Sequence, residues 1–184
     1  MDGPVRWLTL ANLFTLLRLG AAPLLALAVW RDATIAAAAL FWSAVASDFA
    51  DGRIARSRGE ASSLGGLLDH TTDATFVSLG LFAFAAKGAL SFLLPLLIAL
   101  AFAQYAGDSR ALRGRPLRTS LLGRWNGIGY FVLLGMPITR DLLGFTWPSH
   151  DLVSALGWIL VATTLVSMVD RAHALVGTRR RTAL

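Results

Sequence analysis

Six long apolar segments, separated by clusters of charged residues, account for most of this 184-residue sequence. A helix that crosses a lipid bilayer needs about 20 predominantly apolar residues. Hydrophobic residues make up 55% of the chain and charged residues only 15%, which excludes an ordinary soluble domain. The sequence therefore predicts an all-α fold, in which residues 1–184 form a single membrane domain with a bundle of six transmembrane helices. The predicted spans are 8–30, 33–50, 64–86, 89–107, 125–146 and 152–170.

The fifth segment is the weakest of the six. Pro137, Arg140 and Asp141 interrupt its apolar run. Because proline removes a helical hydrogen bond and charged residues are costly in a bilayer, we expect the outer end of this span to kink or to stop early.

The distribution of basic residues predicts the orientation. Of the 17 Lys and Arg residues, 13 would lie on one side of the six spans and three on the other, namely Arg31, Lys87 and Arg140. An excess of basic residues marks the cytoplasmic side of a membrane protein. We therefore expect both termini in the cytoplasm. In so apolar a chain, we interpret the net charge of +6 as a topology signal and as contact with lipid headgroups, and not as a nucleic-acid-binding surface.

Four carboxylates lie where a membrane protein would normally avoid them. Asp48 and Asp51 end the second segment, and Asp69 and Asp73 begin the third. A spacing of three or four places each pair on one helical face, and the short loop between the segments brings the pairs together near the cytoplasmic surface. Like charges held this close repel and would be driven to protonate unless a divalent cation neutralises them, so a metal site is the economical explanation. All-oxygen ligands favour Mg²⁺ or Mn²⁺, and four carboxylates can hold two such ions, which commonly bridge to substrate phosphates.

The segment SDFADGRIARSRGEASSLGGLLDHTTD contains the pattern D-x2-D-G-x2-A-R-x8-G-x3-D-x3-D without a departure. This pattern resembles the signature of the CDP-alcohol phosphatidyltransferase family. The resemblance implies an enzyme of the bacterial inner membrane, with an active site facing the cytoplasm, that acts as a homodimer. It also implies a reaction that transfers a phosphatidyl group from CDP-diacylglycerol to an alcohol and releases CMP.

The resemblance implies a role for each matching position. Asp48, Asp51 and Asp69 would bind the two metal ions, and Asp73 would contact a metal and serve as the general base. The arginine of the pattern would pair with a donor phosphate, and three small residues would let the nucleotide approach the helix backbone closely. These donor-binding residues are Gly52, Ala55, Arg56 and Gly65.

Two further groups of polar residues are candidates for the site. The first segment contains NLFTLLRLGAAP, in which three polar residues share a broad helical face and resemble the first span of the glycerophosphate and cardiolipin branches: Asn12, Thr15 and Arg18. An arginine inside a span should face the bundle or reach the headgroups. Basic residues near later span ends are candidates to bind an anionic acceptor: Arg118, Arg124 and Arg171.

The resemblance favours glycerol 3-phosphate as the acceptor, but one feature conflicts with it. His70 and Ala74 stand where glycerol-phosphate enzymes usually have a proline and an Ala-Asp-Lys pattern, and Asp69-His70 is more similar to choline and ethanolamine phosphotransferases. One alternative is therefore an enzyme that transfers a phospho-alcohol to diacylglycerol. A second is a cation-binding membrane protein or transporter without enzymatic activity.

Overall fold

The computed structural model describes the backbone of residues 10–58, 63–108 and 121–182, and the side chains of residues 13–49, 65–107 and 121–173. Within these ranges the structure contains helices and no strand, so the all-α prediction is confirmed. Each predicted span corresponds to one helix. The helices are α1 (Leu10–Trp30), α2 (Thr34–Arg58), α3 (Ser63–Ala86), α4 (Leu93–Asp108), α5 (Leu121–Leu143) and α6 (His150–Thr182).

Local sequence explains where several of these helices begin and end. The Ser91 hydroxyl accepts a hydrogen bond from the Leu93 N–H, and the Ser149 hydroxyl accepts one from the Leu152 N–H, so serines cap the starts of α4 and α6. Helices α3 and α5 are followed by glycines with left-handed backbone, Gly88 at φ 78° and Gly144 at φ 66°. A residue with a side chain would be strained at either position, which is why glycine terminates both helices.

Helix α5 stops early, as expected for the fifth segment, but its charged residues do not interrupt it. It runs through Pro137 and ends at Leu143, before the predicted boundary at 146. The side chain of Arg140 is buried, and its Nε and Nη1 donate to Asp141 Oδ1 at 2.7 Å and to the Pro148 carbonyl at 3.1 Å. Arg140 and Asp141 therefore hold the outer turn of α5 against the following loop instead of ending the helix.

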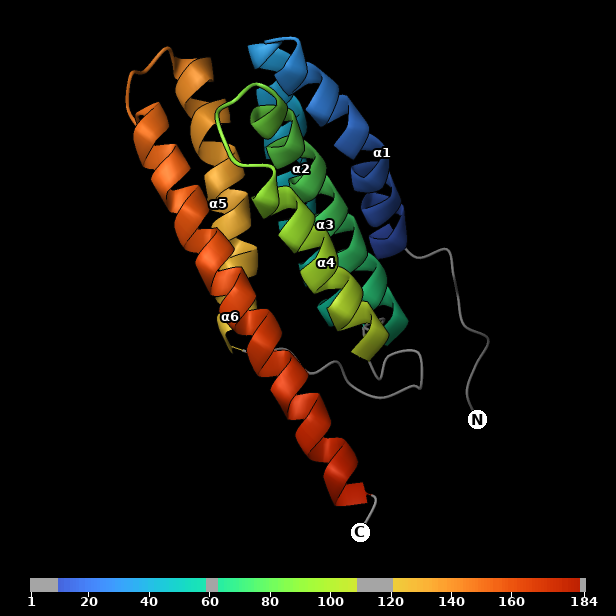
Figure 1. Cartoon of the computed structure of the whole chain (residues 1–184). Coiled ribbons are helices and arrows are strands. Elements are labelled where there is room, and N and C mark those ends of the chain that lie inside the picture. The colour runs from blue at the N-terminus through green and yellow to red at the C-terminus, as the bar shows by residue number, and fades with distance from the viewer. Residues whose placement is uncertain (1–9, 59–62, 109–120, 183–184) are drawn as a thin grey trace.

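The helices alternate in direction and form a closed bundle (Figure 1). Helix α1 packs against α2 and α3, α3 packs against α4, α4 against α6, α6 against α5, and α5 against α2. The start of α1 and the end of α6 therefore lie at one end of the bundle, while the three short connections 31–33, 87–92 and 144–149 lie at the other (Figure 1). This arrangement places Arg31, Lys87 and Arg140 at a common end, as the charge distribution predicts.

The bundle has an apolar interior and an apolar outer surface. Phe76, Leu25, Leu81 and Leu134 are fully buried in a single core cluster. Many large apolar side chains are nevertheless exposed on the outside, among them Trp125 at 68%. Such extensive exposure is unfavourable in water and normal for helices surrounded by lipid. By length and composition, α1 and α6 each contain a stretch that could cross a membrane, at Leu13–Trp30 and His150–His173.

Candidate functional site

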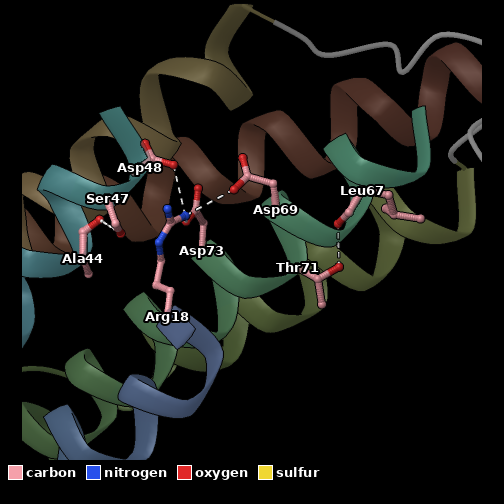
Figure 2. Close-up of polar contacts among 8 residues, drawn as sticks. All are labelled: Arg18, Ala44, Ser47, Asp48, Leu67, Asp69, Thr71 and Asp73. Atoms are coloured by element: carbon pink, nitrogen blue, oxygen red, sulfur yellow. Dashed lines mark hydrogen bonds and ion pairs between the residues drawn. The ribbon is translucent and has the colours of Figure 1, made fainter. Parts of the chain in front are cut away.

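The polar centre of the bundle is formed by Arg18 and three of the predicted carboxylates (Figure 2). Arg18 Nη1 lies 3.0 Å from Asp48 Oδ1, 3.2 Å from Asp69 Oδ1 and 2.6 Å from Asp73 Oδ1. The Arg18 side chain is fully buried, whereas that of Asp48 is 47% exposed. Three helices thus direct carboxylate oxygens and a guanidinium to one point, which confirms that these carboxylates converge.

Helical spacing explains why these groups meet. Asp69 and Asp73 are four residues apart, so both carboxylates project from the same face of α3. Asp48 lies on α2 and Arg18 on α1, and α1 packs against both α2 and α3. Two nearby hydroxyls donate to carbonyls of their own helices, Thr71 Oγ1 to Leu67 at 2.6 Å and Ser47 Oγ to Ala44 at 2.8 Å (Figure 2).

The donor set at this point fits a divalent metal ion. Ligand atoms of Asp69, His70 and Asp73 all lie within 4.8 Å of one another. Asp48 Oδ1 contacts Arg18 Nη1, the same atom that Asp69 and Asp73 contact. Carboxylate oxygens are the ligands that Mg²⁺ and Mn²⁺ prefer, and Mn²⁺ also accepts an imidazole nitrogen. The residues therefore form a group that could bind a metal ion.

A cavity of about 750 Å³ opens beside the carboxylates. Asp48, His70 and Asp73 form part of its wall, and Arg124 and Arg171 line it as well. The cavity thus places two cationic side chains on the same surface as the carboxylate group. This arrangement suits a ligand that carries phosphate. The arginines could bind the phosphate directly, and the carboxylates could bind it through a metal ion.

Several polar residues of this cavity were not predicted from the sequence. Tyr105, on α4, makes an edge contact with His70 at 5.7 Å between ring centroids, and Arg171 Cζ lies 4.8 Å above the Tyr105 ring. Asn126 Nδ2, Gln104 Oε1 and the Tyr105 hydroxyl are buried with no hydrogen-bond partner in the described part of the chain. Buried polar atoms are rarely left unpaired, so these atoms are available to a polar ligand. For Gln104 and Tyr105, the sequence signal is the presence of two polar residues inside an apolar segment.

The remaining predicted residues fall into two groups. Thr15 is buried on the same helix as Arg18, and Gly65 is half-buried one turn before Asp69. The other predicted residues lie outside the described side chains, although all except Arg118 are on described helical backbone: Asn12, Asp51, Gly52, Ala55, Arg56 and Arg118.

Together, the apolar bundle and its carboxylate-bearing polar cavity define the class of all-helical membrane proteins with a candidate metal site. The family model for CDP-alcohol phosphatidyltransferases matches residues 8–169. The chain belongs to this family and is a phosphotransferase of phospholipid biosynthesis. The family resemblance inferred from the Asp48–Asp73 pattern is thereby confirmed, and the non-enzymatic alternative is set aside.

Curated relatives belong to the same area of metabolism. The chain is 29% identical to a probable phosphatidylglycerophosphate synthase of Mycobacterium tuberculosis, over 98% of this chain and 90% of that protein. It is 30% identical to a cardiolipin synthase (CMP-forming)/mitochondrial hydrolase fusion protein of Schizosaccharomyces pombe, over 86% of this chain. The match spans only 30% of the fusion protein's length.

Proposed function

We propose that this protein transfers the phosphatidyl group of CDP-diacylglycerol to glycerol 3-phosphate and releases CMP. The observation that carries the proposal is the shared cavity, in which the carboxylates of Asp48 and Asp73 face the same space as Arg124 and Arg171. The carboxylate side suits a metal-bound diphosphate, and the arginine side suits a second, anionic substrate. The similarity to a phosphatidylglycerophosphate synthase supports the choice of acceptor.

In the proposed reaction, the acceptor hydroxyl oxygen forms a bond to the phosphatidyl phosphorus while the bond from that phosphorus to the CMP oxygen breaks. Asp73 takes the proton of the hydroxyl, since its carboxylate lines the cavity and lies at the centre of the site. Asp48, Asp51 and Asp69, with Asp73, would hold two Mg²⁺ or Mn²⁺ ions. When bound, these ions neutralise the diphosphate and stabilise charge on the attacked phosphoryl group.

The donor would lie along the Asp48–Asp73 pattern. Arg56 would pair with a donor phosphate, because a guanidinium binds phosphate oxygens in a bidentate manner. The nucleotide could approach the helix backbone closely, because the residues beneath it would have small side chains or none: Gly52, Ala55 and Gly65. The exposed apolar surface of the bundle would accommodate the acyl chains in the surrounding lipid.

The proposal includes the setting of the enzyme. Residues 1–184 would act as one domain that spans a bacterial inner membrane six times as a homodimer. Both termini and the carboxylate site would face the cytoplasm, from which a soluble acceptor reaches the cavity. The common end shared by the start of α1 and the end of α6 supports this topology (Figure 1).

The test of this function is CMP release by the purified protein in detergent with CDP-diacylglycerol and Mg²⁺ or Mn²⁺. Glycerol 3-phosphate, inositol phosphate, serine and phosphatidylglycerol would be compared as acceptors. We expect release with glycerol 3-phosphate. No release with any of the four, followed by release with CDP-choline or CDP-ethanolamine plus diacylglycerol, would contradict the proposal and favour the alternative that Asp69-His70 suggests.

Arg171 offers a test of how the acceptor binds. We expect Arg171→Gln to raise the KM for glycerol 3-phosphate about tenfold or more, because a charge-assisted hydrogen bond is lost, with little change in the KM for CDP-diacylglycerol. Steady-state CMP release would measure both constants. Arg31→Gln, which removes a charge at the opposite end of the bundle, is the matched control. Equal changes in the two KM values would argue against a role in acceptor binding.

A further inference from the structure

Arg18 occupies a position that the proposed reaction does not explain. Its Nη1 is within 3.2 Å of oxygens from Asp48, Asp69 and Asp73, and its side chain has no exposure to solvent. A buried charge is costly unless oppositely charged groups surround it. Here three carboxylates from two other helices provide that surrounding, so the guanidinium neutralises much of their mutual repulsion.

Arg18 contacts two of the carboxylates that could hold a metal ion. Asp69 and Asp73 belong to the group that could bind a metal, and in both residues it is Oδ1 that contacts Arg18 Nη1. A divalent ion held by these carboxylates would take up the same negative charge that the guanidinium now neutralises. A cationic nitrogen that stays 2.6 Å from Asp73 Oδ1 and a divalent ion held by the same carboxylates would repel each other strongly.

We propose that Arg18 is an exchangeable counter-cation of the carboxylate cluster, which holds Asp48, Asp69 and Asp73 together when no divalent ion is bound and withdraws when one binds. The negative charge of the cluster is then neutralised by Arg18 when no divalent ion is bound and by the metal ion when one is bound. Arg18 is a positioning residue in this scheme. The inference concerns metal binding alone and does not depend on which alcohol is the acceptor.

Competition between Arg18 and the metal predicts the opposite effect on metal affinity from a role in which Arg18 only orients the carboxylates. If Arg18 only oriented the carboxylates, its loss would weaken metal binding. If Arg18 competes with the metal, its loss strengthens metal binding and weakens the metal-free fold. A ligand that binds more tightly to the folded state also stabilises it more, so the gain in Tm on adding metal should be larger without Arg18.

The experiment measures Mn²⁺ binding to the purified protein by electron paramagnetic resonance of free Mn²⁺, together with Tm with and without Mn²⁺. For Arg18→Gln we expect about tenfold tighter Mn²⁺ binding, a coupling typical of groups in direct contact. We also expect a lower Tm without metal and a larger rise in Tm with it. Arg171→Gln is the control, because it removes a charge from the same cavity at a residue whose cation contacts the Tyr105 ring.

Two results would overturn the inference: unchanged or weaker Mn²⁺ binding by Arg18→Gln, or an equal gain in affinity for Arg171→Gln. Should Arg18→Gln fail to fold, nitrogen-15 spectra of arginine in the wild-type protein decide the question. The Arg18 signal, assigned by its absence from Arg18→Lys, should move on addition of Mg²⁺. A signal that does not move would show that the guanidinium keeps its carboxylate contacts. Because none of these readouts requires turnover, the inference and the proposed function can fail separately.

Discussion

Replacing Asp73 by asparagine is expected to reduce the rate of CMP release by about 100- to 10,000-fold, the contribution of a general base. The substitution preserves the size of the side chain and removes its ability to accept a proton from the acceptor hydroxyl. Asp73 is the closest of the three carboxylates to Arg18 and lines the cavity. We therefore expect the loss to appear in kcat, while CDP-diacylglycerol still binds through metal held by the remaining carboxylates and through basic residues.

A matched control distinguishes this role from a general loss of charge. Asp151→Asn removes an exposed carboxylate in the first turn of α6, at the opposite end of the bundle, and should leave kcat close to the wild-type value. Donor binding would be measured directly, by binding of labelled CDP-diacylglycerol to both variants. Turnover by Asp73→Asn at the wild-type rate would exclude Asp73 as the base.

The fold was largely predictable because its signal is distributed over many residues. Six apolar segments and the charges between them set the number and order of the helices, although α2 and α6 continue past the predicted ends at 50 and 170, to Arg58 and Thr182. The early end of α5 was expected, but the way its charges are accommodated was not. Arg140 and Asp141 interrupt the apolar pattern, yet they pair with each other and Arg140 donates to the Pro148 carbonyl, and neither contact can be read from sequence.

The candidate site was predictable only in part. The spacing of Asp69 and Asp73 fixes their common face, and a charged pattern that ends one helix and begins the next implies that Asp48 lies nearby. The contact of Arg18 with all three carboxylates depends on how α1 packs against α3, which spacing within one segment does not determine. Tyr105 and Asn126 likewise join the cavity through packing between helices distant in sequence.

Removal of divalent metal should have an effect as large as the loss of Asp73. We expect chelation with EDTA to reduce CMP release by at least about 100-fold, because metal ions contribute several kcal/mol of charge stabilisation in phosphoryl transfer. Addition of Mg²⁺ or Mn²⁺ should restore the activity. Ca²⁺ should restore much less, since it is larger and accepts a looser set of ligands than the compact carboxylate group provides.

The same measurement can assign the effect to the carboxylate group. Asp69 contributes one of the oxygens that contact Arg18 and belongs to the set that could hold a metal. Asp69→Asn should therefore need a higher Mn²⁺ concentration for half-maximal CMP release, whereas Asp151→Asn should follow the wild-type curve. If the chelated protein keeps its full rate, the carboxylates do not act through metal. If Asp69→Asn and Asp151→Asn require the same Mn²⁺ concentration, the metal binds elsewhere, and the convergence of Asp48, Asp69 and Asp73 serves only to hold Arg18.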